Sequence, residues 1–276
     1  MGRSFADNFG FVDIHCHCLP GVDDGPATKA EAFALCRALV ADSISTVIAT
    51  PHQLGRFSGC NEPTQVREKV SVFNEELKNS GIALTMMPGA DVRVDERICQ
   101  LLEADKILTL ADGGKYILLE LPHEVFIDIT PLLIELASMG IQVIISHPER
   151  HPALVSQPKE LLKWLGHSAH LQITSASLLG QFGSTAQRAA WNLLTSGLSS
   201  LVATDSHDIK MRRPCLYAAF KEICSQLGET IANLVCIENP SRVIKGQDIV
   251  PVGSIRSSLT MGIKGASDER LQSYSR

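Results

Sequence analysis

The sequence lacks the features that mark several classes of protein. None of its apolar runs approaches the length of about 20 residues that a transmembrane helix needs, so we expect no membrane insertion. The net charge is −5 and the Lys and Arg residues form no notable cluster, which argues against a nucleic-acid partner, because phosphate contacts need clustered basic side chains. No signal peptide opens the chain and its eight cysteines are scattered, so we expect reduced thiols in a cytoplasmic protein.

Nucleotide-binding and nucleophile motifs are also missing. The chain contains no GxGxxG, no GxxxxGK[ST] and no GxSxG segment, so a phosphate-cradling loop and a serine hydrolase have no support. The segment CIENPSR, residues 236–242, has the spacing of a cysteine phosphatase loop. It contains no glycine, however, and Pro240 removes a backbone donor, so we do not expect Cys236 to act as a nucleophile.

The segment FVDIHCHCLPGVDDG, residues 11–25, places two histidines one residue apart. Alternate side chains of a strand share a face, so His15 and His17 point to one side while the neighbouring cysteines point to the other. Two imidazoles beside Asp23 and Asp24 favour a metal site over a buried strand with two hydrogen-bonded histidines. Asp13 is expected to share the face of His15 and to orient it.

Strand and helix patterns alternate along the rest of the chain. A capping-box pattern at Thr28 and Glu31 opens the first helix. The alternation predicts parallel strands with right-handed crossovers, in an α/β domain over residues 11–253. Residues 1–10 are expected to be an N-terminal extension and residues 254–276 a loosely held tail. Seven predicted strands favour a closed or nearly closed barrel: FVDIHC, TVIAT, ALTMMPG, YILLEL, QVIIS, HLQITSAS and SLVAT.

Imidazoles and carboxylates follow the predicted strands at their carboxyl ends, which meet at one rim of a βα barrel. The candidates are His15, His52, Asp91, Glu120, His147, Asp205 and His207. Nitrogen and oxygen ligands without thiolate suit manganese, iron or zinc in a multinuclear site, which would attract and clamp a phosphoryl group. Each histidine of a Pro-His or His-Pro pair could alone be a turn residue, and Asp91 could cap a helix.

Three arginines stand close to these candidates in the sequence. Arg150 ends the run SHPER, and Arg212 and Arg213 follow the last candidate histidine. A guanidinium group offers paired donors that match phosphate oxygens, so these arginines are candidate phosphate ligands.

The order of these motifs resembles the polymerase and histidinol phosphatase (PHP) superfamily. Within it, DIHCHCLPGVDDG, IATPH, ILLELP, SHPER and SLVATDSHD look like the manganese-dependent bacterial protein tyrosine phosphatases of capsule and exopolysaccharide operons, of the CpsB/CapC type. The resemblance covers roughly residues 11–245. It implies a distorted, TIM-like (β/α)7 barrel with three metal ions, and hydrolysis of phosphotyrosine by a metal-activated hydroxide without a phosphoenzyme.

The resemblance also implies roles for individual residues. It assigns His15, His17, Asp91 and Asp205 to the first ion, Asp91, Glu120 and His147 to the second, and Asp23, His52 and His207 to the third. Asp205, Arg150 and one of Arg212 or Arg213 would be catalytic, with the arginines steadying the phosphate. The implied substrate is the phosphotyrosine-rich tail of a tyrosine kinase of polysaccharide synthesis.

Two departures from the family pattern leave alternatives open. Asp91 stands where the family usually has Glu, and the arginine after the last motif is doubled. A small-molecule phosphomonoesterase of the histidinol-phosphate phosphatase type would share the metal chemistry, and a catalytically weak metal-binding regulatory module would share the scaffold. The sequence does not identify the metal or the partner kinase, and it leaves open whether the protein is a homo-oligomer.

Overall fold

The computed structural model describes residues 10–123 and 125–253, so the expected extension and tail lie almost wholly outside the described residues. Its strands are β1 (Phe11–Cys16), β2 (Ile44–Ala49), β3 (His52–Gln53), β4 (Thr85–Pro88), β5 (Asp91–Arg93), β6 (Tyr116–Glu120), β7 (Gln142–Ser146), β8 (His170–Thr174) and β9 (Leu201–Ala203). Its α-helices are α1 (Lys29–Ala41), α2 (Pro63–Asn79), α3 (Ile98–Glu103), α4 (Thr130–Ser138), α5 (Pro152–Ser156), α6 (Pro158–Leu165), α7 (Ser175–Leu178), α8 (Gly183–Thr195), α9 (Leu216–Leu227), α10 (Glu229–Asn233) and α11 (Asn239–Ile244).

The strands form two parallel sheets, in the orders β1-β2-β4 and β3-β5-β6-β7-β8-β9. The predicted α/β class with parallel pairing is therefore confirmed. The strands predicted at TVIAT and ALTMMPG correspond to β2 and β4. After a short break, each is followed by a further short strand, β3 or β5, that pairs in the second sheet. One break falls at Pro51, which has no N–H for a ladder hydrogen bond. The other falls at Gly89, where a Cβ atom would come within 2.5 Å of Ile48 Cγ2.

Two backbone hydrogen bonds join β1 to the segment that follows β9. The amide of Asp205 donates to the carbonyl of His15 at 2.8 Å, and the amide of His17 donates to the carbonyl of Ser206 at 2.9 Å. The C-terminal ends of β1 and β9, which carry candidate metal ligands, are therefore adjacent. Closure of both sheets into one barrel stays a prediction.

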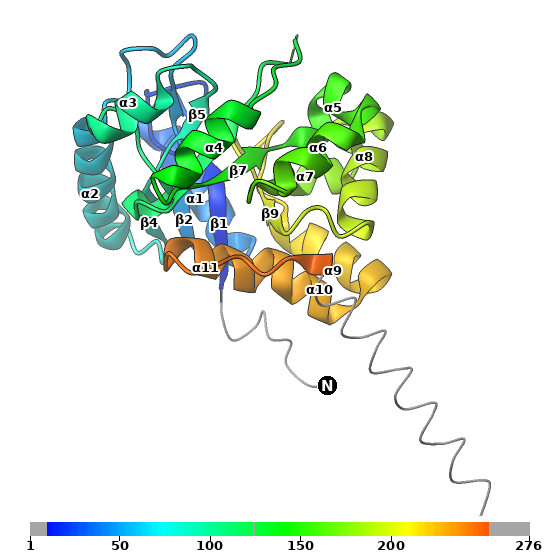
Figure 1. Ribbon diagram of the computed structural model, residues 1–276. Helices are drawn as coiled ribbons and strands as arrows, with labels where there is room; N and C mark the ends of the chain where they lie inside the picture. Colours follow the sequence, from blue (N-terminus) through cyan, green and yellow to red (C-terminus); the bar gives the residue numbers. More distant parts are fainter. Residues whose placement is uncertain (1–9, 124, 254–276) are drawn as a thin grey trace, which may run out of the picture.

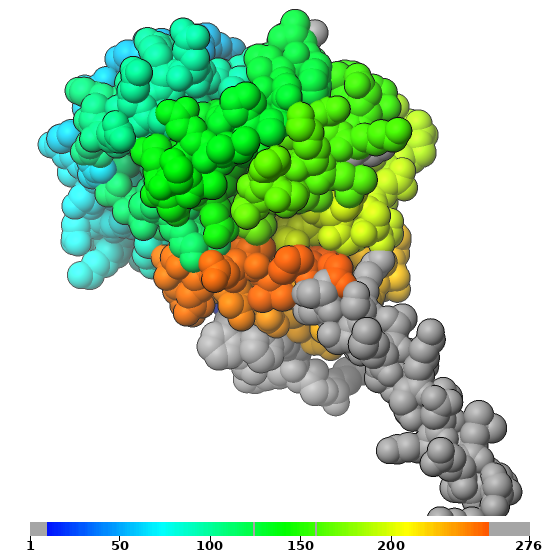
Figure 2. All heavy atoms as spheres, in the orientation of Figure 1, coloured from blue at the N-terminus to red at the C-terminus, as the bar shows by residue number. Residues whose placement is uncertain are grey.

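The helices lie around the outside of the strands, with α9, α10 and α11 gathered along the lower side of the view in Figure 1. In Figure 2 the side chains of the middle of the chain and of the C-terminal helices form a nearly continuous surface over the strands on this face. The predicted capping box at Thr28 and Glu31 is present. Helix α4 begins at Thr130, whose amide donates to the Asp128 carboxylate just before the helix.

A β-bulge in β1 sets the direction of the histidines. Val12 and Ile14 belong to a small hydrophobic cluster with side chains of β2, β6, β7 and β9, whereas Cys16 and Cys18 belong to the large cluster beneath the helices. Between Asp13 and Cys16 the pairing with β2 gains one residue. The extra residue reverses the alternation of side chains, so the side chains of His15 and His17 point to the same side of the strand as the small cluster.

No helix of the described part of the chain has the length and apolarity of a membrane span.

Candidate metal centre

The strand ends bring the predicted imidazoles and carboxylates together. Four overlapping groups have their ligand atoms within 4.8 Å of one another. They are His17, Asp24, His52 and His207; His15, His147 and Asp205; His15, His17 and Asp91; and His52, Asp91 and Glu120. Shared members join the four groups into a single cluster, which includes every predicted ligand except Asp23.

Two ligand candidates follow their strands in a left-handed backbone conformation. His147 comes directly after β7 with a φ of 35°, and Asp205 follows β9 with a φ of 52°. For residues with a side chain this region costs about 1–3 kcal/mol, and such residues concentrate at functional sites. Backbone hydrogen bonds hold both turns, because Arg150 N donates to His147 O at 3.0 Å and Asp205 N donates to His15 O at 2.8 Å.

A hydrogen-bond acceptor at Nδ1 orients each of the imidazoles of His15 and His17. Gln172 Oε1 lies 2.8 Å from His15 Nδ1, and Asp23 Oδ2 lies 2.7 Å from His17 Nδ1. With the protons on Nδ1, the lone pairs of both Nε2 atoms point to the cluster, where these two atoms are 3.3 Å apart. The sequence prediction missed Gln172. Its signal was a polar amide between the apolar residues Leu171 and Ile173 of β8, where a buried amide needs a partner.

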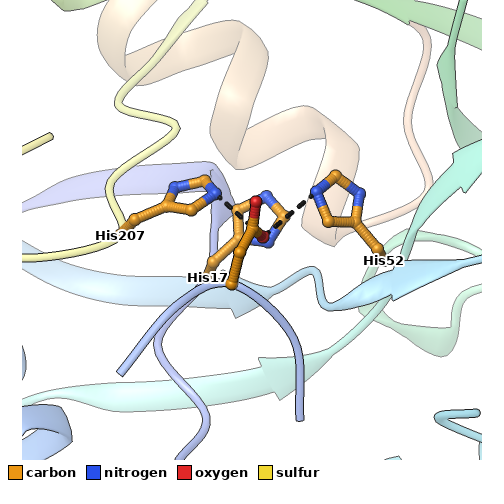
Figure 3. Close-up of side chains that lie close together, drawn as sticks. His17, His52 and His207 are labelled. Atoms are coloured by element: carbon orange, nitrogen blue, oxygen red, sulfur yellow. Dashed lines mark ion pairs between the residues drawn. The ribbon is translucent and has the colours of Figure 1, made fainter. Parts of the chain in front are cut away.

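The two acids of the DDG segment have different places. Asp23 faces the outer nitrogen of His17 and also accepts the amides of Gly25 and His52. Asp24 Oδ1 lies 3.4 Å from His52 Nε2 and 3.5 Å from His207 Nε2, as the dashed lines in Figure 3 show. The geometry therefore places Asp24, and not Asp23, in the ligand group with His52 and His207. Sequence alone could not separate two neighbouring acids, since the loop path sets their directions.

Asp91 provides the test of whether the residues fit a cation. Its side chain is 1% exposed, and neither carboxylate oxygen has a hydrogen-bond donor. Its nearest charged neighbours are His15 Nε2 at 3.6 Å and His52 Nδ1 at 3.4 Å. A buried carboxylate without donors is costly unless a cation compensates it. Together with imidazole neighbours and no thiolate, it fits a divalent ion such as manganese, iron or zinc.

The pKa values of the cluster fit the same interpretation. Burial, reinforced by the charge of Asp91, raises the pKa of Glu120. Although burial opposes it, the carboxylates of Asp205 and Asp91 raise the pKa of His15 to about 9, so these acids favour a positive charge at this point, which a bound cation would supply in place of a proton. Burial and the neighbouring His207 lower the pKa of His17 to about 4, which leaves a neutral imidazole able to bind a metal.

The arginines are separated by the structure. Arg150 Nη2 lies 2.8 Å from Asp205 Oδ2, and Arg212 reaches the same oxygen and also lies 2.8 Å from His207 Nε2. Both arginines line a cavity of about 420 Å³ above the cluster. Arg213 does not line it; this side chain is exposed and interacts electrostatically with Asp42, which caps α9. Arg213 therefore lies outside the site that the sequence predicted for it.

Further residues of the cavity wall were not predicted as site residues. They include Leu54, Gly55, Arg56, Phe57, Arg93 and His123. Among them, Arg93 Nη1 lies 3.1 Å from Glu120 Oε2, and Arg56 Nη2 lies 2.7 Å from Asp24 Oδ2. Their signal was positional, since Arg56 follows the predicted ligand His52 closely and Arg93 follows Asp91.

Two secondary predictions have clear outcomes. The prediction that Asp13 orients the His15 ring is wrong, because the bulge turns Asp13 to Thr204, whose amide and hydroxyl it accepts. Cys236 is fully buried in a π-helical turn, and burial raises its pKa, so the absence of a cysteine nucleophile there agrees with the sequence prediction.

The different positions of Asp23 and Asp24 lead to a testable expectation. We expect Asp24→Asn to lower the number of bound metal ions by one, because it removes a carboxylate from the group with His52 and His207. We expect Asp23→Asn to keep the full number at saturating metal, with affinity weakened about 10–100-fold, because an amide oxygen still accepts the His17 proton. Elemental analysis across a metal titration measures both, and the reverse pattern would restore Asp23 as the ligand.

The chain matches known proteins over most of its length. The family model described as capsular polysaccharide synthesis, CpsB/CapC, matches residues 11–245. The tyrosine-protein phosphatase YwqE of Bacillus subtilis is 35% identical over 247 residues, covering 86% of this chain and 93% of YwqE. The putative tyrosine-protein phosphatase CapC of Staphylococcus aureus is 32% identical over 213 residues, covering 76% of this chain and 82% of CapC.

A solved structure agrees with the sequence relatives. It comes from work on YwqE of Bacillus subtilis and CpsB of Streptococcus pneumoniae, described as metal-dependent tyrosine phosphatases. It superposes with a TM-score of 0.83 at 33% identity and covers 87% of this chain and 96% of its own. Parallel strands that end in clustered imidazoles and carboxylates define an α/β protein with a candidate metal centre. The chain belongs to the CpsB/CapC family of capsular polysaccharide synthesis.

Proposed function

We propose that this chain is a metal-dependent protein tyrosine phosphatase, that is, a phosphoric monoester hydrolase. The observation that carries the proposal is the buried carboxylate of Asp91, which has no hydrogen-bond donor and lies between the imidazoles of His15 and His52. The relatives named as tyrosine phosphatases cover nearly the whole of the described chain, which supports the same activity.

We assign three ions, proposed to be manganese, with iron or zinc as alternatives. The first set is His15, His17, Asp91 and Asp205; the second is Asp91, Glu120 and His147; the third is Asp24, His52 and His207. Proximity supports the sharing of Asp91, because its oxygens lie near His15, His52 and Glu120 together. Divalent ions held there would supply the positive charge that polarises a phosphoryl group and lowers the pKa of water.

The protein's own side chains would bind and orient the phosphate. Arg150 and Arg212 point into the cavity and share one oxygen of Asp205, which fixes the positions of both guanidinium groups. Their remaining N–H groups are suited to phosphate oxygens. Among the described residues that line the cavity, none is Ser, Thr or Cys. This lining supports hydrolysis without a serine or cysteine phosphoenzyme.

The proposed substrate is a phosphotyrosine protein, and the family description suggests a tyrosine kinase of polysaccharide synthesis. We place the reaction in the cytoplasm, in keeping with eight free cysteines. We further propose that residues 11–253 form one domain in which both sheets make a distorted (β/α)7 barrel. The hydrogen bonds between the ends of β1 and β9 support this closure.

Removal and return of metal test the proposal. After treatment with a chelator we expect hydrolysis of a phosphotyrosine peptide to be lost, and we expect manganese to restore it, since the cluster carries the chemistry. Parallel assays with iron and zinc identify the preferred ion. Hydrolysis of histidinol phosphate but not of the peptide would favour the small-molecule enzyme. Metal binding without hydrolysis of either compound would favour a regulatory module.

A further inference from the structure

Phe57 is an aromatic residue at the cavity that has no place in the core. It is half-buried and lines the cavity, yet neither hydrophobic cluster of the described residues includes it. Partly buried aromatic rings elsewhere in the described chain, such as Phe33 and Trp191, pack against the large cluster. The ring of Phe57 therefore has a contact surface that folding alone does not explain.

The ring is held by residues of the metal centre itself. It stacks on the imidazole of His52 at a centroid distance of 5.3 Å and an interplanar angle of 13°. The guanidinium carbon of Arg56 lies 4.7 Å from the ring centroid, and Arg56 also pairs with Asp24 at 2.7 Å. His52 and Asp24 are the two residues whose ion pair appears on the right of Figure 3. The position of Phe57 is thus fixed relative to the site of hydrolysis.

Backbone hydrogen bonds hold the turn that carries Phe57. Leu54 and Gly55 both have a positive φ, of 65° and 56°, and form a tight turn after β3. Phe57 N donates to Leu54 O at 3.0 Å, and Cys60 N donates to Phe57 O at 2.9 Å. A ring on a hydrogen-bonded turn loses little further freedom when a ligand binds against it.

The chemistry of the ring indicates what would bind there. His52 and Arg56 cover part of the Phe57 ring, and the ring also lines the cavity, where its edge can contact a ligand. An aromatic edge is electropositive and prefers the π face of another ring. A second planar group, His123, lines the same cavity and stacks on His147 at 5.7 Å and 14°. An aryl group on a bound phosphate would meet these rings, whereas an alkyl group would gain no edge-to-face contact.

We propose that Phe57 is a specificity-determining residue that selects aryl over alkyl phosphate monoesters by contacting the ring of the leaving group. This inference rests on the proposed phosphatase function and extends it, since it explains how the site would distinguish phosphotyrosine from phosphoserine. The contact acts on the organic part of the substrate, while Arg150 and Arg212 act on the phosphate.

Binding of two phosphonates to the metal-loaded protein tests the proposal. We expect Phe57→Leu to weaken benzylphosphonate binding by about three- to tenfold and butylphosphonate binding by less than about twofold, because only the aryl ligand has a ring to contact. Phe57→Tyr should retain the preference. The matched control is Phe126→Leu, an identical change at an aromatic residue that is 37% exposed and does not line the cavity. Calorimetry gives the dissociation constants, and elemental analysis gives the metal content.

The outcomes separate this inference from the proposed function. Equal weakening of both phosphonates, no weakening of either, or a loss of metal from Phe57→Leu would overturn the role of the ring, whatever the activity. Absence of peptide hydrolysis by the wild type at any metal loading would overturn the phosphatase function, while the dissociation constants would still decide the ring contact. Failure of the metal-loaded wild type to bind either phosphonate would overturn the role of the ring, while peptide hydrolysis would still decide the phosphatase function.

Discussion

Asp91→Asn is expected to lower kcat/KM for a phosphotyrosine peptide by at least about 10³-fold. The carboxylate belongs to two of the four ligand groups, and both its oxygens lack hydrogen-bond donors, so an amide would remove a charge that two cation positions share. Charge stabilisation by a bound ion contributes several kcal/mol to such a reaction, and each 1.36 kcal/mol is tenfold in rate. Steady-state kinetics at saturating manganese measures the loss.

Asp95→Asn is the matched control for this change. Asp95 lies four positions further along the chain, outside every ligand group, and accepts hydrogen bonds from Arg97 that an amide oxygen can also accept. The activity of the Asp95→Asn variant should stay within about twofold of the wild type, because the substitution lies outside the ligand groups and keeps the hydrogen-bond acceptor. An active Asp91→Asn enzyme would show that this carboxylate does not bridge the ions. Asp91→Glu, which keeps the negative charge on a side chain one methylene longer, completes the series.

Arg212→Ala is expected to lower kcat/KM by about 10²–10³-fold, whereas Arg213→Ala should stay within about twofold. Arg212 lines the cavity and contacts Asp205 and His207, and Arg213 is exposed near Asp42. Arg212→Lys should recover only part of the loss, because an ammonium lacks the fork of donors. Equal effects of the two alanine variants would mean that the doubled arginine acts as a pair.

The sequence was sufficient to predict much of the fold and most of the cluster. Apolar runs that end in or lead to His or an acid indicated parallel strands and a shared rim, and β1, β6, β7 and β9 follow those runs. Glu120 and His147 could be predicted as site residues because each directly ends or follows a buried strand. Local periodicity and strand-end position are short-range properties, which a sequence records directly.

Other features depend on the path of the backbone and could not be predicted. Asp23 and Asp24 are chemically identical neighbours. The path of the loop at Gly25 turns Asp23 to Nδ1 of His17 and Asp24 to Nε2 of His52. At Gly25 a Cβ atom would come within 2.4 Å of the carbonyl oxygen of His17. Gln172 likewise gains its role from a contact across the fold, with His15. Such long-range contacts leave no periodic signal.

The extra residue in β1 also determines which metal ions the centre can bind. In a regular strand that continued the direction of Val12 and Ile14, sulfur would enter the cluster in place of nitrogen, since Cys16 and Cys18 would replace the two histidines. Thiolates favour softer ions such as zinc and are open to oxidation, whereas imidazoles with carboxylates accept harder, oxygen-preferring ions. One irregular backbone step thus gives the centre nitrogen and oxygen ligands and keeps the thiols of Cys16 and Cys18 in the hydrophobic interior.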